Sequence, residues 1–165
     1  MKTPSKQLGN LFENKMSKLL STWIFKDKLV LQRHLTSGAI KSTYVGDIVP
    51  LKQINWNKFP FLIECKSGYK SYTPTLYSFS KITDWLSKAL SEVSEKQNII
   101  WLIAKFKSQR GIIFITNHKL NNITPQLIIP LNEQYFYQYN LEELVNFDFY
   151  ELFDDIDFGN TWNHY

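Results

Sequence analysis

Hydrophobic positions recur along this chain first with a helical spacing and then with a strand-like spacing. Over residues 5–22 the apolar side chains fall three or four positions apart, which predicts an amphipathic helix with Ser5 as its N-cap. The same spacing over residues 77–93 predicts a second amphipathic helix. Trp85 lies at the edge of the apolar stripe of this second helix, where we expect it to serve packing.

Five short stretches rich in β-branched and aromatic residues predict strands. They are residues 29–35, 44–49, 61–66, 98–106 and 111–116. One helix, three strands, a second helix and two further strands make an α/β arrangement. We therefore expect a central mixed β-sheet of about five strands, flanked by helices.

The strand predicted at residues 61–66 carries two opposite charges on one face. Side chains alternate across a strand, so Glu64 and Lys66 share a face, while Cys65 points the other way into a core. A buried carboxylate or ammonium costs free energy unless it is paired or bound to a metal. A catalytic site would explain the pair, and the simpler explanation is an edge strand with one face in water.

A second carboxylate lies upstream, on the strand predicted at residues 44–49. Gly46 permits close backbone approach beside Asp47, and a hairpin would bring this strand next to residues 61–66. Asp47 and Glu64 would then converge near the carbonyl of Cys65. Carboxylate and carbonyl oxygens are the ligands that hard divalent cations prefer.

The first helix contributes a further candidate, Glu13. At about 100° per residue it falls at the margin of the apolar stripe, from which it could reach a site between helix and sheet. An ordinary glutamate at the boundary of the stripe explains the same position.

Two polar segments near these residues could contact phosphates. Residues 36–43 combine small hydroxyl side chains with lysine, although a simple connecting loop explains them as well. Residues 67–72 interleave basic and aromatic side chains, which could lie along a nucleic-acid backbone. Tyrosine is also common in ordinary loops.

The composition changes towards the end of the chain. We expect one domain over residues 1–140, followed by an acidic, aromatic segment over residues 141–165 that packs on the domain or on a second subunit. That segment holds seven acidic residues and no Lys or Arg. Asp154, Asp155 and Asp157 could form a second metal site, but a solvated acidic tail is the preferred interpretation.

Positive charge is concentrated in the first part of the chain. Residues 1–70 hold twelve Lys or Arg against four Asp or Glu, within a net charge of +4. A basic surface around carboxylates suits a phosphate-backbone substrate, and a solvated lysine-rich surface is the alternative. The single cysteine excludes an intramolecular disulfide, and no Cys/His cluster suggests zinc. With no apolar run of membrane-spanning length and no signal peptide, we expect a cytoplasmic protein without a membrane partner.

The order of these features resembles the PD-(D/E)XK nuclease superfamily, with its restriction-endonuclease-like fold, and more narrowly the archaeal and phage-type Holliday junction resolvases. The resemblance covers about residues 7–116. It rests on the helix glutamate followed by three short motifs, Ser37-Gly38, Gly46-Asp47-Ile48 and Ile63-Glu64-Cys65-Lys66. One position departs from the archaeal pattern, because Asn14 stands where that pattern has an arginine. The phosphate contact made there would be absent or supplied by Lys15, Lys18 or Arg33.

The resemblance implies a magnesium-dependent endonuclease, with Mn²⁺ as a substitute, that cuts four-way DNA junctions as a homodimer. Asp47, Glu64 and the Cys65 carbonyl would bind the metal, Glu13 a second metal or an outer-sphere position, and Lys66 would be the catalytic lysine. If the chain is phage-encoded, it would act in the host cytoplasm. The residues expected to contact DNA are Lys15, Arg33, Ser37, Lys41, Tyr69 and Lys70.

Two other functions remain open. The same scaffold serves nicking or restriction-type nucleases that act on ordinary duplex, because a fold does not fix the substrate. A DNA-binding module without catalysis is the second alternative, which the intact set of Asp47, Glu64 and Lys66 argues against. A structural protein unrelated to nucleic acid is a distant third.

Overall fold

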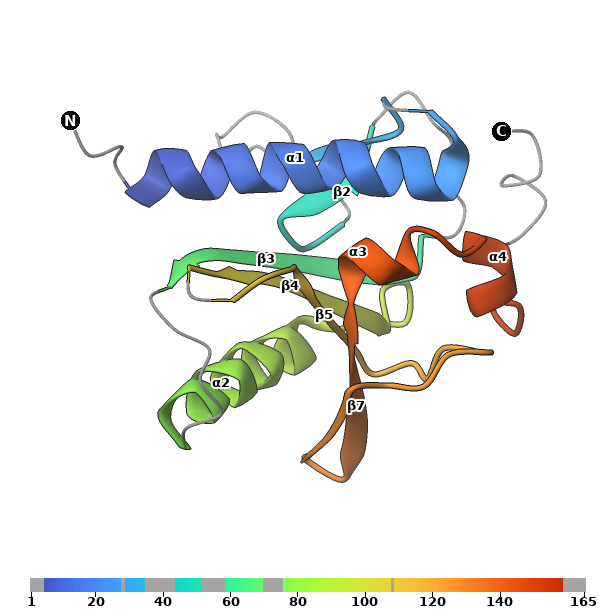
Figure 1. Ribbon diagram of the computed structural model, residues 1–165. Coiled ribbons are helices and arrows are strands. Elements are labelled where there is room, and N and C mark those ends of the chain that lie inside the picture. The colour runs from blue at the N-terminus through green and yellow to red at the C-terminus, as the bar shows by residue number, and fades with distance from the viewer. Residues whose placement is uncertain are drawn as a thin grey trace.

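The computed structural model describes residues 5–27, 29–34, 44–51, 59–69, 76–107 and 109–158. The elements in chain order are α1 (Ser5–Phe25), β1 (Leu31–Arg33), β2 (Ile48–Pro50), β3 (Phe61–Tyr69), α2 (Leu76–Glu92), β4 (Ile99–Phe106), β5 (Ile113–Thr116), β6 (Leu127–Leu131), β7 (Gln134–Asn140), α3 (Leu141–Leu144) and α4 (Phe149–Leu152). α1 lies along one face of the sheet and α2 along the other (Figure 1). None of the described helices is both long and apolar enough to cross a membrane.

The described strands form one seven-stranded sheet in the order β1-β2-β3-β4-β5-β7-β6. The central strands β3 and β4 run parallel, and α2 makes the crossover between them. The other neighbouring strands pair antiparallel. The prediction of an α/β fold with a mixed sheet flanked by helices is confirmed, but the expected number of about five strands was too low.

The two additional strands, β6 and β7, form a hairpin at one end of the sheet. The turn between them uses Asn132 and Glu133, which both have positive φ values, 48° and 62°. Pro130 lies within β6, where it breaks the usual strand pattern in the sequence. It is tolerated because β6 is an edge strand of the sheet, where the side of the strand that faces away from β7 has no neighbour that needs an N–H donor.

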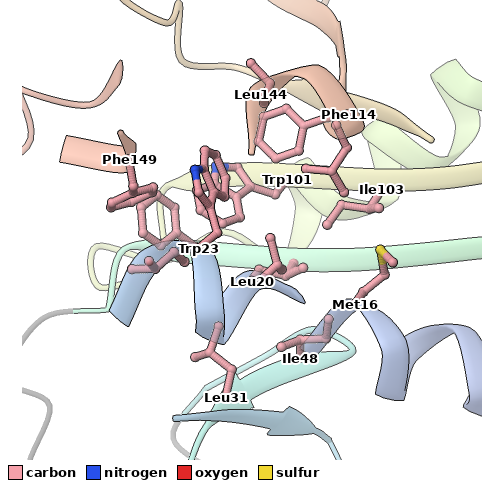
Figure 2. Close-up of a cluster of buried hydrophobic side chains, with 14 of the residues drawn as sticks. Met16, Leu20, Trp23, Leu31, Ile48, Trp101, Ile103, Phe114, Leu144 and Phe149 are labelled. Atoms are coloured by element: carbon pink, nitrogen blue, oxygen red, sulfur yellow. The ribbon is translucent and has the colours of Figure 1, made fainter. Parts of the chain in front are cut away.

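Two hydrophobic clusters lie on opposite faces of the sheet. The smaller one packs α2 against the sheet and includes Leu62, Ile82 and Leu86. The larger one lies on the α1 side and includes Ile63 and Cys65, so the side chains of β3 alternate between the two clusters as predicted. Figure 2 shows how the α1 side chains face the sheet in the larger cluster, with labelled members Met16, Leu20, Trp23, Leu31, Ile48, Trp101, Ile103, Phe114, Leu144 and Phe149.

Residues 141–158 contribute to the larger cluster. Their two short helices are capped by Asn140 and Asp148, whose side chains each accept a hydrogen bond from the backbone N–H two residues ahead. The indole N–H of Trp23 donates to the carbonyl of Phe147 at 3.0 Å. Residues 141–158 are therefore bonded to α1 as well as packed against it.

We predict that Phe149→Ala lowers the free energy of unfolding by about 3–5 kcal/mol, because it removes a fully buried ring. The Phe149 ring centroid lies 5.3 Å from that of Trp23 and 6.1 Å from that of Trp101. Phe147→Ala is the matched control, since its ring is 44% exposed and its carbonyl is retained, and it should change the free energy by only about 0.5 kcal/mol. Urea unfolding measures both, and equal effects would contradict a role for residues 141–158 in the core.

Candidate active site

The segment before β2 approaches β3 unusually closely. Gly46 has a φ of +108°, and a Cβ atom at this position would lie 2.7 Å from the carbonyl oxygen of Ile63. The backbone N–H of Asp47 donates to the same oxygen at 2.7 Å, and the N–H of His34 donates to the Asp47 carbonyl at 2.7 Å. Only glycine allows both this conformation and this approach, so Gly46 determines where Asp47 lies. Asp47 itself lies in a bend just before β2, not on the strand predicted at residues 44–49.

The side chain of Asp47 occupies the edge of β3 where β2 no longer pairs with it. The register between the two strands includes Ile48 opposite Ile63. Two residues further along β3, the N–H of Cys65 donates to Asp47 Oδ2 at 2.7 Å. Because the N–H and C=O groups of one residue in an extended strand point to the same side, the Cys65 carbonyl is directed towards this edge as well.

Glu64 and Lys66, which flank Cys65 on β3, place their charged groups beside the Asp47 carboxylate. The Lys66 ammonium donates to Glu64 Oε2 at 2.7 Å and lies 3.8 Å from Asp47 Oδ2. Glu64 is only 6% exposed, whereas the Lys66 side chain is 21% exposed, so the carboxylate of the pair is the part sheltered from water. One lysine thus contacts two carboxylates. A strand with one face in water does not explain the pair, because Glu64 is buried.

Glu13 approaches this group from α1, with its side chain 18% exposed. Its Oε2 lies 3.8 Å from Arg33 Nη1, and that arginine also donates to Asn10 Oδ1 at 3.2 Å. Burial and the charge of Asp47 raise the pKa of Glu13, while Arg33 and Lys66 oppose the rise. The charge of Glu13 therefore interacts with those of Asp47, Glu64 and Lys66. Within the described part of the chain, no three His, Cys, Asp or Glu side chains lie close enough together to hold a metal ion.

The raised pKa of Asp47 indicates that its ionised form is disfavoured at this site. Burial, and then the neighbouring Glu64 carboxylate, raise the pKa of Asp47, although its hydrogen bond from Cys65 and the Lys66 charge lower it. Burial alone would lower the pKa of Lys66, but the Glu64 and Asp47 carboxylates outweigh it and raise that pKa. Lys66 is therefore an ammonium ion at neutral pH.

Cys65 is a buried core residue and not a reactive thiol. It is 7% exposed and belongs to the larger hydrophobic cluster. Burial, and then the charge of Asp47, raise the pKa of its thiol well above the ordinary value. Since a thiol must lose its proton to act as a nucleophile, only the backbone groups of Cys65 can serve the site.

The remaining candidate residues are scattered around this group. Lys15 is exposed on α1. The Tyr69 ring packs at the end of β3, with its centroid 4.8 Å from that of Trp85 and 4.7 Å from the Lys81 ammonium. Three further candidates fall outside the described residues: Ser37, Lys41 and Lys70.

The acidic residues near the end of the chain take separate partners. Asp155 accepts a hydrogen bond from the His118 ring at 3.0 Å, and Asp154 accepts one from Asn121. Both aspartates are exposed. These exposed positions with separate partners favour solvated aspartates over a second metal site. The segment is not the solvated acidic tail of the preferred interpretation, because residues 141–158 pack into the larger cluster.

Two polar residues that the sequence pattern did not single out brace the Asp47 segment. His34 contacts the carbonyl of Gly46 through its ring Nδ1 at 3.0 Å. Gln97, two residues before β4, bonds to the backbone of Val45. His34 lies within the strand predicted at residues 29–35, and Gln97 precedes the strand predicted at residues 98–106. Neither has a periodic signal of its own, so only the folded contacts reveal its role.

Comparison with known protein families places the chain in one of them. Residues 4–159 match the protein family described as "Phage putative PDDEXK endonuclease". No curated protein and no solved structure matches the chain significantly. The match covers nearly the whole chain and extends well beyond residues 7–116, to which the sequence resemblance was limited. With an α/β mixed sheet and the Asp47, Glu64 and Lys66 group at the edge of its central strand, the chain belongs to the phage PDDEXK endonuclease family, a family of nucleases.

Proposed function

We propose that this protein is a magnesium-dependent, structure-specific endonuclease that resolves four-way DNA junctions by phosphodiester hydrolysis. The observation that carries the proposal is the meeting of Asp47, Glu64 and Lys66 at one edge of β3. Two carboxylates that could hold a divalent cation, with an ammonium within contact distance of both, suit metal-assisted phosphodiester hydrolysis.

The donor groups suit a hard divalent cation. Asp47, Glu64 and the carbonyl of Cys65 would hold Mg²⁺, with Mn²⁺ as a substitute, and Glu13 would hold a second ion or act from an outer-sphere position. The raised pKa of Asp47 and its closeness to Glu64 indicate an excess of negative charge that a cation would relieve. When bound, the metal would stabilise the charge that develops on the scissile phosphate and acidify the attacking water.

Lys66 would act on the attacking water and on the phosphate. Lys66, which stays protonated beside Glu64, would orient the attacking water and stabilise negative charge on the phosphate in the transition state. The water oxygen would form the new bond to phosphorus as the bond to the 3′ oxygen breaks. A proton would pass to that oxygen, which leaves a 5′-phosphate and a 3′-hydroxyl.

Binding would rest on the basic surface around the site. Lys15 and Arg33, with Ser37, Lys41, Tyr69 and Lys70, would contact the DNA backbone and neighbouring sugars or bases. Arg33 Nη1 lies 3.8 Å from Glu13 Oε2. Glu13 directly precedes Asn14, the residue that departs from the archaeal pattern. We infer that Arg33 supplies the phosphate contact that Asn14 cannot make.

A four-way junction is recognised by its shape and backbone, which suits a basic surface without a base-reading motif. Its resolution needs two symmetric incisions, so we propose a homodimer with one site for each strand of like polarity. The alternative is a nicking or restriction-type nuclease that acts on linear duplex in the cytoplasm of the host. A non-catalytic DNA-binding module is the less favoured alternative.

The test of function is cleavage of a synthetic four-way junction in Mg²⁺ against a linear duplex of the same sequence. We expect strong preference for the junction, paired incisions, and a protein that sediments as a dimer. Equal cutting of the duplex would support the nicking or restriction-type alternative. No cutting of either substrate with Mg²⁺ or Mn²⁺ would reject the proposal in favour of a binding module.

Substitutions in the carboxylate and lysine group should separate cutting from binding. We expect Asp47→Asn, Glu64→Gln and Lys66→Ala each to reduce the cleavage rate by about 10²–10³-fold, because each removes a charge that acts on the reacting phosphate or its metal. Junction affinity in a gel-shift assay should change little, since most of it comes from the lysine-rich surface. Lys119→Ala, an exposed and distant charge, is the control. Parallel loss of binding and cutting would count against this division.

The raised pKa of Asp47 predicts a pH-dependent stability difference in the metal-free protein. A raised folded-state pKa means that stability is present while Asp47 is protonated and is lost as the pH rises through that pKa. Asp47→Asn should therefore melt a few degrees above the wild type at pH 7.5, and the difference should vanish below the unfolded-state pKa of about 4.

Mg²⁺ should raise the melting temperature of the wild type but not of Asp47→Asn, because a ligand stabilises only the protein that binds it. The exposed Asp84→Asn in α2 is the matched control: its melting temperature without metal, and the increase that Mg²⁺ causes, should equal those of the wild type. A metal-free wild type that is more stable than Asp47→Asn at pH 7.5 would refute this electrostatic account.

A further inference from the structure

Gln97 is a buried polar side chain at the start of the central strand β4. It is 1% exposed and lies in the short connection between α2 and β4. A buried amide costs free energy unless its donors and acceptor are paired. The hydrogen-bond partners of this side chain therefore decide what it does.

All three partners of the Gln97 amide belong to the two segments that form the active site. Its Oε1 accepts from the N–H of Val45 at 2.7 Å, and its Nε2 donates to the carbonyl of Val45 at 2.9 Å. The same Nε2 donates to the carbonyl of Phe61, the first residue of β3, also at 2.9 Å. The amide thus pairs with Val45 as a neighbouring strand would, and it ties that residue to β3.

Hydrogen bonding rather than apolar packing holds Val45 in place. Val45 is 42% exposed, so burial of its side chain contributes little to its position. It stands two residues before Asp47 and is separated from it only by Gly46, which adopts a left-handed conformation. A shift of Val45 would therefore be transmitted directly to the Asp47 carboxylate.

Gln97 is itself rigidly placed. Its backbone N–H contacts both the carbonyl and the hydroxyl oxygen of Ser94 at 3.2 Å, and its carbonyl accepts from the Ser94 N–H at 3.0 Å. Two residues later, the N–H of Ile99 donates to the carbonyl of Pro60 at 3.0 Å. The backbone of Gln97 is therefore held by bonds that do not involve Val45, so its side-chain amide can impose a position on the Val45 segment.

We infer that Gln97 is a positioning residue, which sets the Asp47 carboxylate at the edge of β3 for metal binding. It acts through Val45 and Gly46 and touches neither the metal nor the substrate. His34 braces the same segment from the β1 side through the Gly46 and Asp47 carbonyls. The inference rests on the proposed function for its catalytic consequence, while the effect on Asp47 can be measured without catalysis.

The test compares Gln97→Met, which keeps the length of the side chain and removes its hydrogen bonds, with Gln138→Met. Gln138 is also a buried glutamine, 6% exposed, but it lies on β7, three strands from β3 in the sheet order. The first readout is hydrogen exchange of the Cys65 amide, which reports the Asp47 carboxylate that accepts from it. We expect Gln97→Met to lower the protection of Cys65 by about tenfold or more while that of Ile103 in β4 is retained.

The second readout is the Mg²⁺ concentration that gives half-maximal junction cleavage. Gln97→Met should raise it by about 10–100-fold, the usual effect of losing a residue that orients a metal ligand. The cleavage rate at saturating Mg²⁺ and the junction affinity should stay close to those of the wild type. If Gln97→Met does not fold, Gln97→Glu replaces it, since it keeps the acceptor for Val45 and loses both donors, and it should change both readouts in the same direction.

Unchanged Cys65 protection and Mg²⁺ dependence in the folded variant would overturn the inference. So would changes no larger than those of Gln138→Met, because they would reflect general stability alone. A wild type that cuts no DNA would reject the proposed function instead. In that case the Cys65 amide, together with direct Mn²⁺ binding measured by paramagnetic resonance, would still decide whether Gln97 positions Asp47.

Discussion

The hydrogen bond from the Cys65 N–H to the Asp47 carboxylate is the interaction on which the site depends. It forms because the chain enters β2 through Gly46, close enough to β3 for Asp47 to replace a strand partner at the edge. The same bond places Asp47 beside Lys66, which already contacts Glu64. A different register between β2 and β3 would move Asp47 away from both residues of β3.

This arrangement is unfavourable for the metal-free fold, and the rest of the protein compensates for it. Like charges and burial raise the pKa of Asp47 and of Glu13, so each ionised carboxylate opposes folding at neutral pH. The opposing contribution comes from the aromatic cluster between α1, the sheet and residues 141–158. Because Trp23 is bonded to Phe147 and packed against Phe149, the end of the chain holds the helix that carries Glu13.

The parts of the fold predicted from the sequence are those with a strong local pattern. The two long helices and the five predicted strands are present, because apolar spacing at 3.6 or 2 residues follows directly from burial on one face. The β6–β7 hairpin was not predicted, since Pro130 interrupts its pattern and exposed positions of an edge hairpin carry little hydrophobic signal. The placement of Asp47 before β2, and not within it, also follows from contacts with β3 that no local pattern encodes.

For the site, the sequence by itself determined the chemistry available: two carboxylates, a lysine two positions after one of them, and a glycine beside the other. The tertiary structure alone decided the pairing of Lys66 with Glu64 and Asp47, the pairing of Glu13 with Arg33, and the bracing of the Asp47 segment by His34 and Gln97. The physical reason is the separation along the sequence of the residues that interact. Alternation along a strand links residues two positions apart, whereas a hydrogen bond between Val45 and Gln97 joins residues that only the crossover through α2 brings together.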